Sequence, residues 1–164
     1  MIQRIKEIRK CLNANLYEAA LALALTLPDI CGQIEYPNAL VGKRYRDWIS
    51  NFVDKELLCD RLFENDFEYL TSADLYNLRC SFLHSGNDDI GKGHINEFHL
   101  LSPSITNGQY GYRYGIRTNQ DGTETHIAEI DIKYLCEILC DAAEKYYQTR
   151  KPEDFEEHIF VLQT

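Results

Sequence analysis

A nearly uninterrupted apolar stretch close to the N-terminus sets the strongest limit on the fold. Residues 16–27 have the sequence LYEAALALALTL, in which almost every side chain is apolar. A helix without a polar face is usually covered on several sides, so we expect this segment at the centre of a helical assembly. Pro28 follows directly and either kinks this helix or begins a new turn. The stretch therefore predicts helix over residues about 15–34.

The remaining sequence predicts further helices and a small sheet. Apolar side chains recur at spacings of three and four, as in amphipathic helices, over residues about 2–12, 42–58, 72–85 and 132–149. Alternating apolar and polar side chains predict strands within residues about 95–132, with turn signals at Asn107-Gly108 and Asp121-Gly122. We therefore predict a mainly helical α+β fold, a helical bundle with a small antiparallel β-sheet inserted before the last long helix. The 164 residues fit a single domain, 1–164.

The middle strand carries a run of tyrosines. Tyr110, Tyr112 and Tyr114 alternate with Gly111 and Arg113. The period of two predicts that the three tyrosines share one face of the strand. Such a face stacks bases in proteins that bind single-stranded nucleic acid, whereas in most sheets it packs against a helix.

The charge balance restricts the possible partners. The chain has 17 Lys and Arg residues against 26 Asp and Glu residues, a net charge of −9. No general attraction to nucleic acid or to an anionic membrane follows, so binding of RNA would require a local basic patch. The densest basic cluster consists of Lys43, Arg44 and Arg46. We expect no membrane association, because the longest apolar run is too short to span a bilayer.

The cysteines do not indicate a metal site. Their spacing matches no zinc motif, and no signal peptide is visible, so we expect reduced and mostly buried thiols in a cytoplasmic protein without a metal or cofactor. The six residues are Cys11, Cys31, Cys59, Cys80, Cys136 and Cys140.

The segment TSADLYNLRCSFLHSG, residues 71–86, predicts one helix with signals at both ends. Thr71 and the acidic residue three positions later match a capping box, and a glycine follows the last turn. Arg79 falls within the apolar arc of this helix, and its permanent charge requires acceptors. Asp29 and Glu35 are candidate partners, because they are the carboxylates nearest the apolar stretch; alternatively they are a cap and a surface residue.

Arg79 and His84 form a pair that suits ribonuclease chemistry. Histidine exchanges a proton near neutral pH, and arginine binds a phosphate group through two nitrogens. The stretch LYNLRCSFLHSGN, which contains both, resembles the helix that bears the Arg-x4-6-His motif of the HEPN superfamily. HEPN domains are helical bundles, often paired as homodimers with the motif helices at the interface. Many are metal-independent ribonucleases of toxin–antitoxin, phage-defence and CRISPR systems, and others are binding modules without catalysis.

The resemblance implies roles for individual residues. Arg79 would bind phosphate and His84 would be the general acid and base, without a cofactor. The residue after the arginine is often Asn or Asp in the family, whereas this sequence has Cys80. The predicted strands are an addition to the simplest HEPN bundle.

Two functions remain open at this stage. The first is a non-catalytic, homodimeric interaction module of bacterial or phage origin that binds a protein partner, in which Arg79 pairs with Asp29 or Glu35. The alternative is a metal-independent endoribonuclease of the toxin or phage-defence type, in which the basic cluster helps to bind RNA. Exposure of Arg79 and His84 in one shared cleft would favour the enzyme. Complete engagement of Arg79 by carboxylates of the same chain would favour the interaction module.

Overall fold

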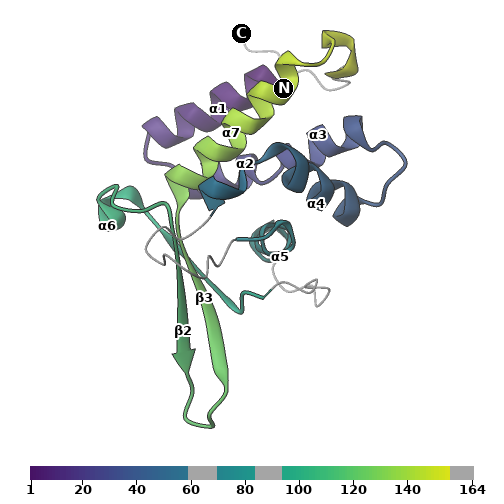
Figure 1. The fold of residues 1–164 in the computed structure, drawn as a ribbon. Helices are drawn as coiled ribbons and strands as arrows, with labels where there is room; N and C mark the ends of the chain where they lie inside the picture. The colour runs from purple at the N-terminus through teal and green to yellow at the C-terminus, as the bar shows by residue number, and fades with distance from the viewer. Residues whose placement is uncertain (59–69, 84–93, 156–164) are drawn as a thin grey trace.

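The structure, a computed structural model, describes residues 1–58, 70–83 and 94–155. Helices form the body of the molecule, and a hairpin of two strands projects away from it (Figure 1). The described elements are α1 (Ile2–Asn13), α2 (Tyr17–Ala24), α3 (Leu27–Glu35), α4 (Val41–Phe52), η1 (Lys55–Leu58), α5 (Ser72–Leu83), β1 (Glu97–Leu101), α6 (Pro103–Thr106), β2 (Tyr112–Thr118), β3 (Glu124–Asp131), α7 (Ile132–Gln148) and η2 (Pro152–Phe155). The predicted α+β fold, mainly helical with a small sheet before the last long helix, is confirmed.

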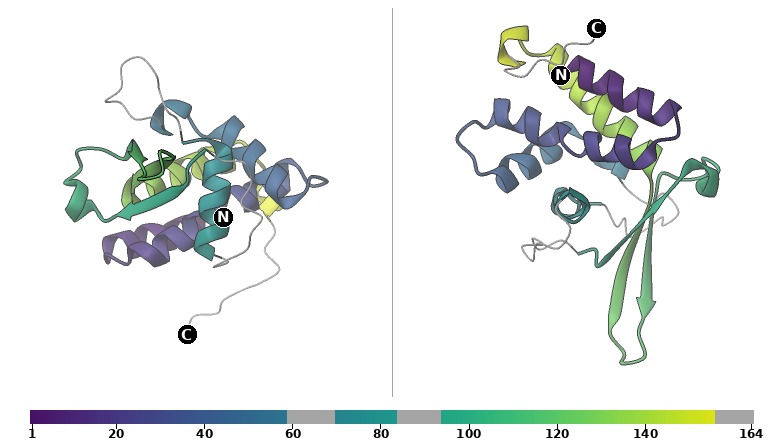
Figure 2. Two further views of the ribbon diagram at one scale, coloured as in Figure 1. Left: turned by 90° about the horizontal axis from the view of Figure 1, so that it is seen from below. Right: turned by 180° about the vertical axis from the view of Figure 1, so that it is seen from behind.

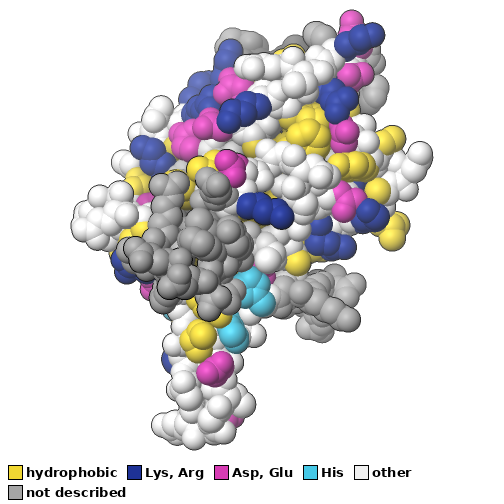
Figure 3. All heavy atoms as spheres, in the orientation of Figure 1, with side chains coloured by type: hydrophobic (Ala, Val, Ile, Leu, Met, Phe, Trp, Pro, Cys, Tyr) yellow, Lys and Arg dark blue, Asp and Glu magenta, His cyan; other side chains and the backbone are white. Residues whose placement is uncertain are grey.

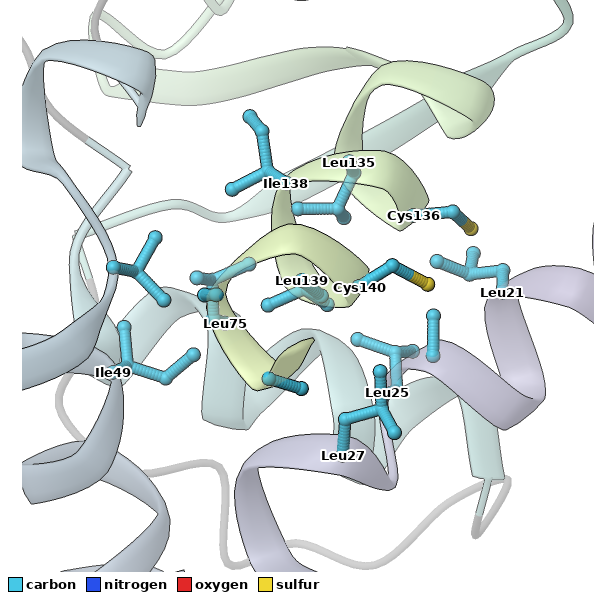
Figure 4. Packing of buried hydrophobic residues seen from close by; sticks show 14 of the residues in the cluster. Leu21, Leu25, Leu27, Ile49, Leu75, Leu135, Cys136, Ile138, Leu139 and Cys140 are labelled. Carbon is cyan, nitrogen blue, oxygen red and sulfur yellow. The ribbon is translucent and has the colours of Figure 1, made fainter. Parts of the chain in front are cut away.

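Helix α7 forms the centre of the body. It packs against α1, α2, α3, α4 and β3, and it lies along α1 when the molecule is seen from behind (Figure 2). Its inward side chains meet Leu21 and Leu25 on one side and Ile49 and Leu75 on the other (Figure 4). The hydrophobic core therefore surrounds this C-terminal helix.

The prediction that residues 16–27 supply the central helix is wrong. Helix α2 has eight residues, and Leu16, just before it, is 56% exposed. Ala19 is also exposed, whereas Leu21 is fully buried. Most of the apolar side chains in α2 are alanines, which present little apolar surface to water and therefore do not require a cover on every side.

Pro28 begins a new helix. Helix α2 ends at Ala24, and α3 begins at Leu27 with the proline in its first turn, where no intrahelical N–H is needed. The predicted helix over 15–34 is therefore two helices. The helix predicted over 42–58 is likewise divided, because α4 ends at Phe52 and η1 follows.

The three-stranded sheet has the order β1-β3-β2. Strands β2 and β3 are antiparallel, with Tyr112 opposite Ile130, whereas β1 and β3 are parallel, with Phe98 opposite Ala128. The sheet is thus mixed rather than purely antiparallel. Since α6 and β2 lie between β1 and β3 in the chain, no hairpin turn fixes the relative direction of these two strands.

The two predicted turns have different outcomes. Gly122, with a φ of 83°, lies in the turn that joins β2 to β3, as predicted. Asn107, with a φ of 50°, instead ends the short helix α6. Its Asn-Gly pair does not form a hairpin because β1 and β2 are not neighbours in the sheet.

The tyrosines of the middle strand do not all share a face. Tyr112 is buried in the core, in agreement with packing against helices rather than with base stacking. Tyr110 precedes β2, and its hydroxyl donates to Glu129 at 3.3 Å. The guanidinium of Arg113 lies 3.9 Å from the centre of the Tyr110 ring. Tyr110 thus lies with Arg113 and Glu129, on the face of the sheet opposite to the face that carries Tyr112.

The described cysteines are free thiols, as expected. Cys31, Cys136 and Cys140 are fully buried. Burial raises the pKa of the Cys31 thiol and of the Cys140 thiol to about 12 each. These thiols are therefore structural rather than reactive. None of the helices in the described ranges combines the length and the apolar surface that crossing a bilayer requires.

Candidate functional site

Helix α5 carries the residues that the sequence analysis placed at the centre of the function. It lies between α4 and the strands (Figure 1). Its start matches the predicted capping box: the Thr71 N–H donates to the Asp74 carboxylate at 2.9 Å, and the Asp74 N–H donates to the Thr71 hydroxyl at 3.2 Å. Arg79 lies in the second half of α5, and His84 lies outside the described residues. The geometry of the Arg79–His84 pair therefore stays a prediction.

Arginines from two helices converge on one tyrosine of α5. The guanidinium of Arg46, from α4, lies 5.3 Å from the centre of the Tyr76 ring, and that of Arg79 lies 5.9 Å from it. Both distances are within the range of cation–π interactions. Gly42 makes the approach possible, because a Cβ there would lie 3.0 Å from the Tyr76 hydroxyl and 3.2 Å from Arg46 Nη1. We call Arg44, Arg46, Tyr76 and Arg79 the arginine–tyrosine cluster.

Asp29 is a described carboxylate that contacts two arginines of this cluster. Arg44 Nε donates to Asp29 Oδ1 at 2.8 Å, and Arg79 Nη2 lies 4.0 Å from Asp29 Oδ2. The side chains of Arg44 and Arg79 are each 16% exposed, and that of Asp29 is 25% exposed. Asp29 thus links α3 to α4 at short range and to α5 at longer range. Its interaction with Arg79 agrees with one of the two predicted pairings.

Glu35, the other predicted partner of Arg79, lies in a different part of the structure. It accepts a hydrogen bond from the Tyr146 hydroxyl at 2.9 Å and pairs with Arg150. These contacts fasten the end of α3 to the end of α7. We therefore exclude Glu35 from the candidate site.

The basic cluster predicted from the sequence divides between two environments. Arg44 and Arg46 join Arg79, whereas Lys43 is 64% exposed and pairs with Asp47. Lys and Arg side chains are visible over α4 and beside α5 (Figure 3). Arg46 forms no ion pair with any described residue, so three arginine charges meet one described carboxylate. Among the described residues, the three guanidinium groups thus outnumber the carboxylates in contact with them, whereas the whole chain has a net charge of −9.

Electrostatics at Tyr76 follow from its surroundings. Burial raises the pKa of the Tyr76 hydroxyl, and its interaction with the Cys80 side chain adds to the shift. Arg79 and Arg46 act in the opposite direction. The phenol therefore remains protonated and adds no negative charge to the cluster.

A second polar site on α5 was missed by the sequence analysis. The Asp74 side chain is fully buried, and its carboxylate accepts from the backbone N–H groups of His94 at 2.9 Å and Ile95 at 3.2 Å. His94 Nδ1 also lies 3.0 Å from the same carboxylate. The sequence contained one usable signal. Asp74 lies one turn before Leu78 on the same side of the helix, and this side is apolar.

This site continues onto the sheet. The rings of His94 and Tyr114 have centroids 6.1 Å apart, and the Tyr114 hydroxyl is hydrogen-bonded to His126 Nδ1. Histidine side chains are exposed beside the strands (Figure 3). Asp74 and Arg79 are five residues apart, about 140° around the helix, so the two polar sites occupy different sides of α5.

The described residues offer no group of three or more side chains that could hold a metal ion. At the arginine–tyrosine cluster, the guanidinium groups can bind an anion. Comparison of the chain with protein-family models, with curated proteins and with solved structures gave no match.

Proposed function

We propose that the arginine–tyrosine cluster binds the phosphate backbone of RNA and that the chain is a metal-independent endoribonuclease. The convergence of Arg44, Arg46 and Arg79, with Asp29 as the described counter-charge of Arg44 and Arg79, carries the proposal. Guanidinium groups match the geometry of phosphate oxygens and donate two hydrogen bonds at once. The resemblance of residues 75–87 to the Arg-x4-6-His helix of HEPN ribonucleases supports the same assignment.

The proposed reaction is an internal transesterification. The ribose 2′-oxygen attacks the adjacent phosphorus and loses its proton to the histidine, and the 5′-oxygen leaves with a proton. The products are a 2′,3′-cyclic phosphate and a 5′-hydroxyl. Arg79 stabilises the negative charge that develops on the phosphate oxygens, and His84 transfers the protons. Because HEPN domains are often homodimers, we propose a homodimer for this chain, which light scattering after size-exclusion chromatography tests.

A second function, the non-catalytic interaction module, is favoured by one observation. The contact of Asp29 with Arg79 connects α3 to α5, which is the arrangement expected of a structural arginine. At 4.0 Å, however, this contact is longer than a hydrogen bond, and the shorter contact of Asp29 is with Arg44. We rank RNA cleavage above a purely structural role because Arg46 also converges with Arg79 on Tyr76, which a structural pair of Arg79 with Asp29 does not require.

Cleavage of single-stranded RNA and of total tRNA in EDTA tests the proposal. We expect wild type to produce cyclic phosphate ends, and we expect Arg79→Ala and His84→Ala to cleave at least about 100-fold more slowly. Arg117→Ala is the matched control, because Arg117 is an exposed strand arginine paired with Glu97. Its cleavage rate should equal that of wild type.

Circular dichroism of each variant separates lost chemistry from lost folding. If wild type cleaves neither RNA and Arg79→Ala is much less stable than wild type, the arginine is structural and the interaction module is the better assignment. Full activity of both variants would contradict the proposed roles of Arg79 and His84.

The variant Asp29→Asn distinguishes RNA binding from a purely structural role of Arg79. Asp29 repels phosphate and competes for Arg44 and Arg79, so its neutralisation should tighten RNA binding about fivefold, roughly 1 kcal/mol. Fluorescence anisotropy with a 2′-O-methyl oligonucleotide, which has no free 2′-hydroxyl and cannot be cleaved, measures this affinity. Glu97→Gln is the control, since its partner is the surface residue Arg117. A less stable Asp29→Asn protein with unchanged or weaker RNA binding would instead support the structural role.

A further inference from the structure

Tyr76 lies where the two helices of the arginine–tyrosine cluster meet. Its ring packs against the fully buried ring of Tyr45, with 5.4 Å between the two ring centres. The guanidinium groups of Arg46 and Arg79 lie 5.3 Å and 5.9 Å from the centre of the Tyr76 ring. These contacts explain an aromatic ring at this position. They do not explain its hydroxyl, because a phenylalanine ring would make the same contacts.

The Tyr76 hydroxyl lies beside a guanidinium nitrogen of Arg46 on the surface of α4. A Cβ on Gly42 would lie 3.0 Å from the hydroxyl oxygen and 3.2 Å from Arg46 Nη1, so both atoms border the same point. Tyr76, Gly42 and Arg46 are all partly exposed. Because Gly42 has no side chain, it covers neither of the two atoms. The hydroxyl and the guanidinium therefore lie together at the boundary with solvent.

The described part of the protein offers neither group a strong acceptor. The side chain that interacts with the Tyr76 hydroxyl is that of Cys80, one turn later in α5, and a thiol is a weak hydrogen-bond acceptor. Burial raises the pKa of the Tyr76 phenol, which therefore keeps its proton for donation at neutral pH. Arg46 forms no ion pair with a described residue, in contrast to Arg44, which pairs with Asp29. Two adjacent donors of this kind suit an acceptor from outside the protein.

We propose that the Tyr76 hydroxyl and the Arg46 guanidinium bind the same phosphate group of the RNA backbone. This proposal rests on the proposed RNA-binding function and adds Tyr76 to its site as a residue that contacts the substrate. The hydroxyl donates to one non-bridging oxygen and the guanidinium to the other, because tyrosine and arginine side chains both bind backbone phosphates of nucleic acids. The ring of Tyr76 holds Arg46 and Arg79 beside this phosphate.

Tyr76→Phe tests the hydroxyl separately from the ring, with Tyr110→Phe as the matched control. Tyr110 also has an arginine over its ring, Arg113 at 3.9 Å, but it lies outside the cluster, and its hydroxyl donates to Glu129. Anisotropy measures the affinity of each variant for the 2′-O-methyl oligonucleotide. We expect Tyr76→Phe to bind about 10-fold more weakly than wild type, with an unchanged melting temperature. Tyr110→Phe should bind as wild type does.

The salt dependence of binding distinguishes a direct contact of the hydroxyl from an effect through Arg46. A neutral hydroxyl releases no counterion, so Tyr76→Phe should lower the affinity by the same factor at every salt concentration. Arg46→Ala removes a charge and should make the slope of log affinity against log salt concentration shallower by about 0.7. A slope in Tyr76→Phe as shallow as in Arg46→Ala would mean that the hydroxyl only positions the arginine, which overturns the proposed contact.

The remaining outcomes separate this proposal from the proposed function. If Arg46→Ala weakens binding and Tyr76→Phe does not, the role of the hydroxyl is overturned and RNA binding stands. If binding depends on Tyr76 as expected but wild type cleaves no RNA, the phosphate contact stands and the ribonuclease is overturned. A wild type that does not bind the oligonucleotide overturns both. A clearly lowered melting temperature of Tyr76→Phe would show that the hydroxyl is used within the protein, which also overturns the proposal.

Discussion

Asp74→Asn is expected to lower the free energy of unfolding by about 3 kcal/mol or more. One carboxylate oxygen accepts from the N–H groups of His94 and Ile95, and the other accepts from Thr71 and from the His94 ring. An asparagine presents an amide NH₂ in place of one of these oxygens. In either orientation, at least two donors then face another donor in a region from which water is excluded.

Urea unfolding monitored by circular dichroism measures this effect. Asp121→Asn is the control, because Asp121 also accepts from a backbone N–H, that of Thr123, but lies exposed in the turn between β2 and β3. Its change should be within about 0.5 kcal/mol. An equally small change for Asp74→Asn would mean that the buried carboxylate is not the link that holds the segment before β1 to α5.

Gly32→Ala should destabilise the protein by about 2–3 kcal/mol, because the added methyl group overpacks the contact of α3 with α4. The new Cβ would lie 2.7 Å from the backbone carbonyl oxygen of Arg44. Backbone cannot rotate away as a side chain does, so α4 must shift. Since α4 positions Arg44 and Arg46, we also expect weaker RNA binding from this variant.

Gly115→Ala provides the comparison for Gly32→Ala. A Cβ at Gly115, in β2, has no atom within 4 Å, so the same chemical change meets open space. Both variants are measured by urea unfolding and by anisotropy with the 2′-O-methyl oligonucleotide. Equal stability of the two would contradict the close approach of α3 and α4.

Local features of this fold were predictable from the sequence. The predicted helices over 2–12 and 132–149 agree with α1 and α7 to within one residue, and the capping box at Thr71 and the turn at Gly122 are confirmed. Each of these features depends on side chains only a few positions apart. The apolar spacing of a helix, the residues of a cap and the residues of a turn can therefore be recognised directly in the sequence.

The candidate site was predictable only in part. Arg79 and Asp29 were identified because a permanent charge within an apolar arc needs a partner, but the choice between Asp29 and Glu35 was open. Sequence distance did not reveal that Glu35 reaches Tyr146, 111 residues away. Nor did it reveal the pairing of the buried Asp74 with His94, which forms only when the segment before β1 folds against the start of α5.

The sequence by itself determined most of the helix positions, the region of the strands, the mainly helical class and the identity of the charged residues that need partners. Only the tertiary structure decided that α7 is central, that β1 runs parallel to β3, that Arg46 and Arg79 meet at Tyr76, and that Arg44 and Arg79 meet at Asp29. The physical reason is the range of the interactions. Hydrogen bonds and apolar spacing within an element act over a few residues, whereas the position of one element on another depends on packing between segments far apart in the chain, such as the contact of Gly32 with Arg44.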